Sequence, residues 1–324
     1  MKNIFSKYFS SIVCLFAINK AHHSQYLCTA SGYHPKQEII LLGVRFIHSE
    51  TVFPIPVEKV IILQQKIIDI HTHIWPEKLA PRAVNHVGEY YSYEMHGKGT
   101  LNDLKESALD AGVEYFVIHS SAPKASQVED VNTNAALNIT DKIAGFGTLH
   151  PEYNNFEKEI NRIVSLGLKG IKLHPDFQFF NIDDKRMYEA YEIISAKGLP
   201  VLFHMGDVNY DYSSAKRLSK LMNDFPKLIC IGAHLGGHLK WDEAEEFLIG
   251  KNLYLDSSST SRRLSPKEIK RLIRLHGADK ILFGTDYPIE RHKEALENFF
   301  RLGLSDDENE KILFSNAWKL VYNK

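Results

Sequence analysis

Residues 67–73 read Ile-Ile-Asp-Ile-His-Thr-His, an apolar run that ends in two histidines separated by one residue. Such a run is typical of a buried β-strand. Side chains alternate along a strand, so Asp69, His71 and His73 are predicted to share one face. Two imidazoles at a strand end can bind one metal ion, and neutral imidazole suits zinc and its neighbours. Two surface histidines would give the same spacing, so the choice depends on the rest of the chain.

Seven further apolar runs follow, and helical patterns separate them. The runs are residues 115–118, 143–149, 170–173, 200–203, 228–233, 253–255 and 281–284. Apolar residues recur at helical spacing over residues 100–112, 160–166, 187–194, 218–225 and 269–275. Near-continuous apolar strands that alternate with helices indicate a parallel sheet covered on both faces. Eight such units favour an α/β fold of the closed (β/α)8 TIM-like barrel type, with an open doubly wound sheet as the alternative.

Local signals place some of the helix boundaries. Glycine stands at the expected C-terminal ends of four helices, at positions 112, 167, 198 and 277. Ser305 and Glu308 have the spacing of a capping box, which predicts that the last helix begins there. Residues 74–100 are predicted to be a long connection. A connection of this length in a compact domain is usually a lid or a binding loop.

The composition is that of an ordinary globular protein. Of its 324 residues, 44% are hydrophobic and 24% are charged, and 39 basic residues nearly balance 40 acidic ones. This balance gives no sign of a nucleic-acid partner or of a basic membrane-binding surface. The three cysteines are scattered and form no C-x-x-C motif, so neither a disulfide framework nor a cysteine zinc site is expected. A barrel of about 250 residues with additional segments would fit the length.

The first 60 residues stand apart from this pattern. Lysines at positions 2 and 7 precede a short apolar run over residues 12–18, which is the outline of an export signal. The run is too short to span a bilayer, and no clean cleavage site follows it. The preferred interpretation is a cytoplasmic protein with an extension at residues 1–60, or with a start codon assigned too early. Residues 61–324 are then the barrel.

Polar residues end most of the predicted strands. They are His71 and His73, Lys172 and His174, His204, His234 and Asp286. A closed barrel brings the carboxyl ends of its strands to one face, where barrel enzymes keep their active sites. Unpaired imidazoles and carboxylates gathered there would cost stability unless something binds them. His150 also follows a strand but is a weaker candidate that could be structural, and His119 is weaker still.

The same motifs resemble a known family. They are Ile-Asp-Ile-His-Thr-His at 68–73, Gly-Ile-Lys-Leu-His-Pro at 170–175, Val-Leu-Phe-His at 201–204, Ala-His-Leu-Gly-Gly at 233–237 and Leu-Phe-Gly-Thr-Asp-Tyr-Pro at 282–288. Because these motifs follow one another in this order, the sequence resembles the amidohydrolase superfamily. It is most similar to the amidohydrolase-2 branch, which includes the aminocarboxymuconate-semialdehyde and resorcylate decarboxylases. The resemblance runs from about residue 67 to the C-terminus.

The resemblance implies a site with one divalent metal, zinc first and manganese as the alternative. Its implied ligands are His71, His73, His204 and Asp286, with His234 and Asp286 as the catalytic residues. Three nitrogens and one carboxylate leave room for water or substrate, as in catalytic sites. Dimers are common in the family, so a homodimer is an expectation.

Three further residues are expected beside the metal. Asp69 would orient a ligand or bond to backbone, and His174 would face the substrate. Some superfamily members carboxylate a lysine at the position of Lys172 to bridge two metals. The branch that this chain resembles is expected to bind one metal, with Lys172 as a cation that orients the substrate or a ligand.

Two reaction classes fit this ligand set. The first is hydrolysis of an amide or ester-type bond of a small organic molecule by metal-activated water, with Asp286 as the proton acceptor. The alternative is non-oxidative decarboxylation, in which Asp286 or His234 would protonate the carbon that loses CO2. A cationic clamp for a substrate carboxylate would favour decarboxylation. Arg262 and Arg263 could form one, or could belong to a solvated loop.

Overall fold

The computed structural model describes residues 15–17, 26–28 and 66–323. Contacts divide the chain into two units, Met1–Ile62 and Leu63–Lys324. In the first unit, β1 (Leu15–Ala17) pairs with β2 (Tyr26–Cys28) in antiparallel fashion. The rest of the predicted extension, with most of the predicted export signal, lies outside the described residues.

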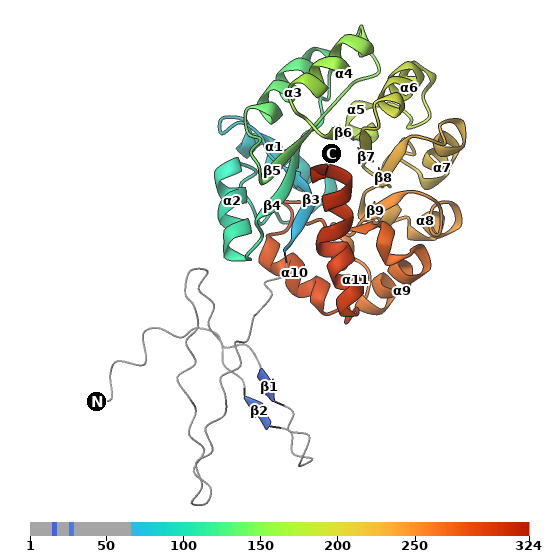
Figure 1. Ribbon diagram of the computed structural model, residues 1–324. Helices are drawn as coiled ribbons and strands as arrows, with labels where there is room; N and C mark the ends of the chain where they lie inside the picture. Colours follow the sequence, from blue (N-terminus) through green and yellow to red (C-terminus); the bar gives the residue numbers. More distant parts are fainter. Residues whose placement is uncertain (1–14, 18–25, 29–65, 324) are drawn as a thin grey trace, which may run out of the picture. The chain divides into compact units, whose positions relative to one another are not determined.

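In residues 66–323, eight parallel strands form one sheet in sequential order (Figure 1). They are β3 (Ile68–His73), β4 (Tyr115–His119), β5 (Ile143–Gly147), β6 (Gly170–Leu173), β7 (Pro200–Phe203), β8 (Ile229–Gly232), β9 (Tyr254–Asp256) and β10 (Ile281–Leu282). The first and last strands meet through a parallel bridge between Thr72 and Tyr287. Two backbone bonds of 2.9 Å, Ile70 N to Phe283 O and Asp286 N to His71 O, close the same seam. The predicted (β/α)8 barrel is confirmed.

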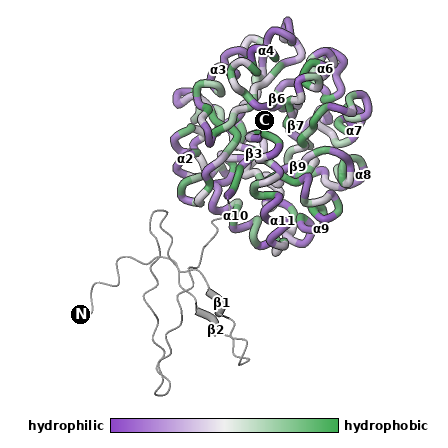
Figure 2. The backbone as a smooth tube through the Cα atoms, in the orientation of Figure 1, coloured by the Kyte–Doolittle hydropathy of each residue, from purple (hydrophilic) through white to green (hydrophobic). Residues whose placement is uncertain are grey.

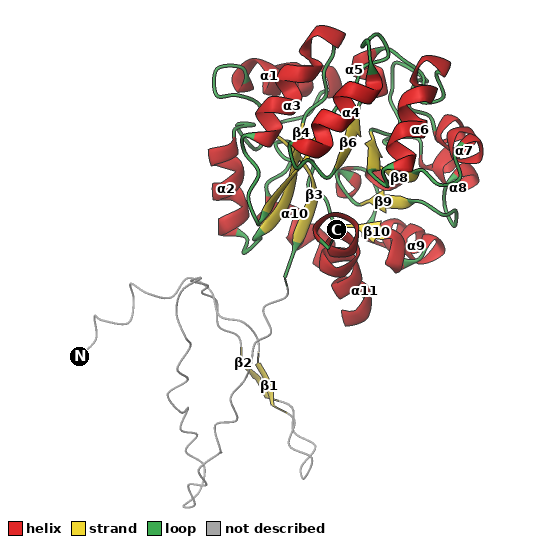
Figure 3. Ribbon diagram, turned by 45° about the horizontal axis from the view of Figure 1, so that its top comes forward, coloured by secondary structure: helices red, strands yellow, loops and turns green. Residues whose placement is uncertain are grey.

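Helices surround the strands (Figure 3). They are α1 (Ala80–Tyr91), α2 (Leu101–Asp110), α3 (Val128–Ala136), α4 (Phe156–Ser165), α5 (Pro175–Gln178), α6 (Tyr188–Ala196), α7 (Ala215–Asp224), α8 (Trp241–Phe247), α9 (Pro266–His276), α10 (His292–Phe300) and α11 (Asp306–Glu310). The predicted helix ends are confirmed at Ser305, which forms a capping box with Glu308, and at Gly277, whose φ is 102°. Within the described residues, no helix combines the length and apolar character needed to cross a bilayer.

The barrel has two separate apolar layers. One lies inside the strands and includes Ile68, Val117, Phe146 and Leu202. The other lies between the strands and the helices. Hydrophilic residues gather at the outer turns of the helices (Figure 2). Buried apolar area on both faces of the sheet is the main source of stability for such a fold.

The C-terminal segment closes one end of the barrel. After α11 it runs through two π-helical turns, Lys311–Ser315 and Trp318–Tyr322, and lies across the barrel (Figure 1). The hydroxyl of Tyr322 donates to the carbonyls of Phe116 and Lys142, both at 3.0 Å, where β4 and β5 begin. This end is therefore filled by side chains. The polar strand ends lie at the opposite, C-terminal end, where the predicted site belongs.

Two expectations from the sequence are wrong. Residues 74–100 are not one long loop, because they contain α1. Ala80, Val84, Val87 and Tyr91 recur in it at helical spacing, a stripe that the prediction overlooked, and of the residues in this helix only Ala80 is buried. The second error concerns β3, where the pairing register with β4 shifts between Asp69 and Thr72. This irregularity breaks the alternation of side chains that the strand pattern predicted.

Asp69 consequently does not join the two histidines. Its carboxylate accepts hydrogen bonds from the backbone N–H of His71 at 2.9 Å and from the Thr285 hydroxyl at 2.6 Å. It also lies 3.3 Å from His292 Nε2 at the start of α10. Asp69 therefore ties β3 to the segment after β10 and acts on the backbone of His71, not on its ring.

Candidate metal centre

Three donor atoms meet at the C-terminal end of β3. The Nε2 atoms of His71 and His73 are 3.1 Å apart, and each lies 3.3 Å from Asp286 Oδ1. Both histidines come from β3, and Asp286 is held beside them because its backbone N–H bonds to the carbonyl of His71. His71 is fully buried, and His73 and Asp286 are nearly so. Two imidazole nitrogens and a carboxylate oxygen directed at one point are a donor set for a divalent metal.

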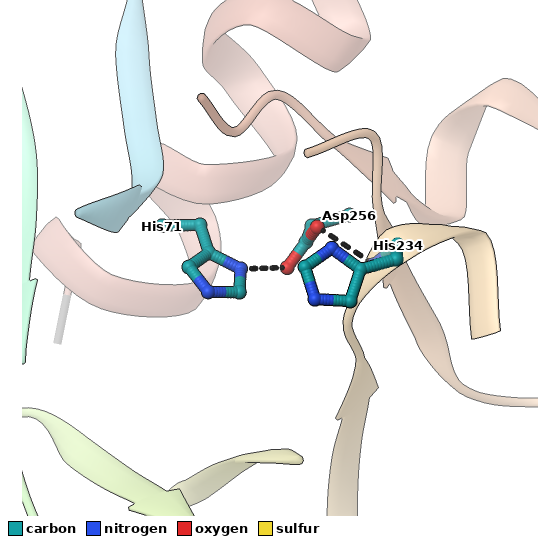
Figure 4. Close-up of side chains that lie close together, drawn as sticks. All are labelled: His71, His234 and Asp256. Atoms are coloured by element: carbon teal, nitrogen blue, oxygen red, sulfur yellow. Dashed lines mark hydrogen bonds and ion pairs between the residues drawn. The ribbon is translucent and has the colours of Figure 1, made fainter. Parts of the chain in front are cut away.

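The ring of His71 is held in one tautomer by Asp256, at the end of β9. His71 Nδ1 donates to Asp256 Oδ2 at 2.8 Å, which leaves the lone pair of Nε2 free to face His73 (Figure 4). The Asp256 carboxylate also accepts the backbone N–H of His234 at 3.1 Å. Burial would raise the pKa of Asp256, but the neighbouring His71 lowers it well below its usual value. A carboxylate that orients a ligating histidine is a common feature of metal sites.

The sequence analysis did not assign Asp256 a role. A signal was present, because Asp256 ends a predicted strand just as Asp286 does. The family motifs quoted above do not include it, and only the folded barrel shows that it reaches His71.

We expect the substitution Asp256→Asn to lower metal affinity about 10- to 100-fold, as loss of outer partners of metal ligands typically does. The amide can also present an N–H to His71, which would favour the wrong tautomer. The measurement is a competition titration of Zn²⁺ with a chromophoric chelator. An unchanged affinity would show that Asp256 does not control the His71 ring.

His73 and His234 are neutral near pH 7. Burial lowers the pKa of His73 to about 4, despite an opposing hydrogen bond to Asp286. Burial also lowers the pKa of His234. Neutral imidazole is the form that binds metal, so no proton has to be removed from these rings before a metal can bind.

Lys172 lies in the same space, as expected from its place at the end of β6. Its Nζ is 3.2 Å from His71 Nε2, and the side chain is fully buried. Burial lowers the pKa of Lys172 to about 8, while Asp256 and Asp286 oppose this effect. Lys172 therefore still carries a positive charge near neutral pH, next to the donor atoms.

His234 stands on the other side of Asp286. Its Nδ1 lies 4.0 Å from Asp286 Oδ2 and donates to the carbonyl of Ser258 at 3.1 Å. Its Nε2 is thereby left unprotonated and lies 3.2 Å from His204 Nδ1. The predicted catalytic pair, His234 and Asp286, is thus close together at the edge of the centre.

His204 is not part of the three-atom donor group. It belongs to a second group with His174 and Asp176. Its Nε2 donates to the carbonyl of Gly206 at 3.0 Å, and its ring stacks on that of His174 with centroids 3.9 Å apart. The structure brings His71, His73 and Asp286 together but directs the His204 nitrogens elsewhere. Its role as a fourth ligand stays a prediction.

Tyrosines of α1 lie over this second group. The Tyr91 hydroxyl is 3.3 Å from His174 Nε2 and 3.2 Å from His204 Nε2, and it donates to Asp207 at 3.3 Å. Tyr90 donates to the same carboxylate at 3.1 Å. Burial raises the pKa of both tyrosines, so the hydroxyls stay protonated. His174 thus lies beneath α1, and its role beside a substrate stays a prediction. Both tyrosines fall within residues 74–100, which were predicted to be a connection.

Comparison with known proteins agrees with the fold. Residues 68–321 match the family model described as amidohydrolase. Among solved structures, an uncharacterised TIM-barrel protein from Bordetella bronchiseptica is 23% identical, with a TM-score of 0.66 over 79% of this chain and 98% of that one. No curated protein matches the chain.

Two further similar structures belong to proteins whose names state an activity. A dihydroxybenzoic acid decarboxylase from Polaromonas, with bound manganese and the inhibitor 2-nitroresorcinol, is 17% identical, with a TM-score of 0.62 over 79% of this chain and 96% of that one. A probable 2-pyrone-4,6-dicarboxylic acid hydrolase from Acinetobacter baumannii, with citric acid bound, is 15% identical, with a TM-score of 0.58 over 79% and 98%. These likenesses show a shared fold.

Proposed function

Because this chain belongs to the amidohydrolase family of enzymes, we propose that His71, His73 and Asp286 hold one divalent metal ion and that the enzyme hydrolyses an amide or ester-type bond of a small organic molecule. The observation that carries this proposal is the approach of the two Nε2 atoms, which lie 3.1 Å apart, to Asp286 Oδ1, which lies 3.3 Å from each of them. These three atoms are the nitrogen and carboxylate donors that divalent zinc takes in proteins.

Zinc is the proposed metal, with manganese as the alternative. A donor set with two nitrogens and one carboxylate suits either ion. When bound, a divalent ion supplies Lewis acidity, which polarises a carbonyl and makes water more acidic.

Asp286 is proposed as the general base. Burial would raise the pKa of Asp286, but His71 and a hydrogen bond to His73 hold it well below its usual value. The carboxylate is therefore ionised and can accept a proton from water at Oδ1 or Oδ2. The Ser259 hydroxyl donates to Oδ2 at 2.7 Å, which fixes the carboxylate plane.

His234 and Lys172 are proposed to orient the substrate. His234 Nδ1 lies 4.0 Å from Asp286 Oδ2, so its ring is placed to contact the water or the substrate next to the base. The Lys172 ammonium can donate a hydrogen bond to a substrate oxygen that approaches the donor group. Positive charge placed where negative charge develops is a large contribution to catalysis of acyl transfer.

Decarboxylation is the second candidate, and Lys172 is the observation that favours it. A buried ammonium 3.2 Å from the donor group could pair with a substrate carboxylate. The similar structures include decarboxylases of aromatic acids. Against it, the low pKa of Asp286 makes this residue a poor acid for protonating carbon. Arg262 does not form a clamp either, because its Nε lies 3.2 Å from Glu290 and its Nη2 donates to the carbonyl of Ile289.

The two reactions are separable by their products. The zinc-loaded and manganese-loaded enzyme is assayed for CO2 release from 2,6-dihydroxybenzoate and 5-carboxyvanillate. In parallel, it is assayed for proton release from a panel of lactones, esters and amides that includes 2-pyrone-4,6-dicarboxylate. We expect hydrolysis that a chelator abolishes. CO2 release as the only activity would replace the first candidate by the second.

A further inference from the structure

The chain over residues 76–96 leaves the barrel after β3 and returns to it at a narrow neck. The backbone N–H of Trp75 donates to the carbonyl of Gly99 at 2.8 Å, which joins the two sides of the neck. On the returning side, the backbone N–H of Gly97 donates to the carbonyl of Pro288 at 2.9 Å. Both ends of this excursion are therefore anchored, and α1 lies between them.

Little apolar contact holds α1 on the barrel. Of the residues in this helix only Ala80 is buried. An open cavity of about 860 Å³ lies between α1, which contributes Val84 and Gly88 to its lining, and the returning chain, which contributes Met95 and Lys98. A segment with few buried apolar contacts opens at a low cost in free energy, because little surface has to be exposed.

Tyrosine hydroxyls hold the C-terminal part of the excursion on the strand ends. Tyr90 and Tyr91 donate to the carboxylate of Asp207, at 3.1 and 3.3 Å. The Tyr93 hydroxyl lies 3.1 Å from Nε2 of His238. Only 1% of the surface of Asp207 is exposed, so its carboxylate is a fixed acceptor. Hydrogen bonds, more than apolar burial, therefore keep α1 in this position.

In this position α1 covers the two stacked histidines of the site. The Tyr91 hydroxyl lies 3.3 Å from His174 Nε2 and 3.2 Å from His204 Nε2. Each of these histidines is only 5% exposed. A small molecule cannot reach their Nε2 atoms while the hydroxyl is there.

We propose that residues 76–96 form a lid over the His174 and His204 side of the site, which must lift before a small-molecule substrate can enter. The hydrogen bonds of Tyr90 and Tyr91 to Asp207 are the latch that keeps it closed. Hydrogen bonds of this kind contribute modestly to stability, so the native enzyme can open such a lid. Asp207 is then a positioning residue, which acts on the substrate only through the lid.

The first test measures the distance from α1 to the barrel by double electron–electron resonance. Spin labels are placed at His86→Cys on α1 and at Lys267→Cys on α9, because both positions are exposed. Cys14 and Cys28 are replaced by serine, and the remaining Cys230 is buried. We expect one main distance, that of the closed lid, in the chain with the latch intact.

Replacing Tyr90 and Tyr91 together by phenylalanine removes the latch and keeps both rings against Phe177. The population at a second distance should then rise at least about tenfold, because hydrogen bonds to a charged acceptor are lost. Tyr254→Phe is the matched control, since Tyr254 lies on β9 against Lys280. An unchanged distance distribution in the double phenylalanine variant would overturn the proposal.

The second test measures access to the covered site. His174→Cys places a thiol beneath the lid, and its reaction rate with N-ethylmaleimide is followed by peptide mass spectrometry. We expect the thiol to react at least about tenfold faster when Tyr90 and Tyr91 are phenylalanine. Equal rates with and without the latch would overturn the proposal, because α1 would then not control access. The spin labels occupy exposed positions, so the first test decides if His174→Cys does not fold.

Both measurements use the metal-free chain, which separates the lid from the proposed function. Failure of the native chain to bind zinc or manganese would overturn the metal site and leave the lid standing. Stoichiometric metal together with unchanged distances and labelling rates would overturn the lid alone.

Discussion

Replacing both His71 and His73 by alanine should abolish metal retention while the barrel stays folded. The two rings supply two of the three donor atoms that meet at Asp286, and one carboxylate alone holds zinc weakly. The fold should survive because Asp256, which loses its hydrogen bond from His71, still accepts hydrogen bonds from other groups. The backbone N–H groups of His234 and Ser258 still bond to it, at 3.1 and 3.0 Å.

The measurement is the metal content of the purified variant by elemental mass spectrometry, with circular dichroism as the test of folding. His86→Ala is the matched control, because His86 is an exposed histidine on α1 and should retain the native metal content. Stoichiometric metal in a folded double variant would remove the β3 histidines from the site.

Asp286→Asn should keep part of the metal and lose most of the turnover. The amide oxygen can still face the two imidazoles, but an amide cannot accept the proton that an ionised carboxylate accepts. General-base catalysis typically contributes about 10²- to 10⁴-fold, so we expect a loss of that size in kcat. Asn tolerates the left-handed backbone of this position, where φ is 61°, so the loop should keep its shape.

Single-turnover kinetics with the substrate found in the product screen is the measurement for Asp286→Asn. The metal content of the same preparation separates loss of the base from loss of the ion. Near-normal turnover with a full complement of metal would exclude Asp286 as the proton acceptor.

The barrel was predictable because its signal repeats. Eight apolar runs ending in polar residues leave few other arrangements, and runs such as residues 170–173 and 200–203 match the bounds of β6 and β7. α1 carries the same kind of signal, because Ala80, Val84, Val87 and Tyr91 recur at helical spacing, but its segment was interpreted as a connection. Of the residues in this helix only Ala80 is buried.

The centre was predictable at the level of strand ends but not of side-chain directions. His71, His73 and Asp286 meet as expected, because a closed barrel brings the ends of β3 and β10 together. Strand periodicity misplaced Asp69, because the register shift in β3 leaves no mark in the sequence. Asp256 fixes the tautomer of His71 through a contact between β9 and β3, which lie far apart in the chain. The spacing of residues in the sequence does not predict such a contact.

The most direct test of the metal centre is the metal content of the native enzyme after reconstitution with zinc or manganese. Elemental mass spectrometry on the dialysed protein gives the number of ions per chain. The account predicts about one divalent ion per chain, lost with the His71 and His73 rings. No bound ion after reconstitution with either metal would contradict it, because His71, His73 and Asp286 would then meet for some reason other than metal binding.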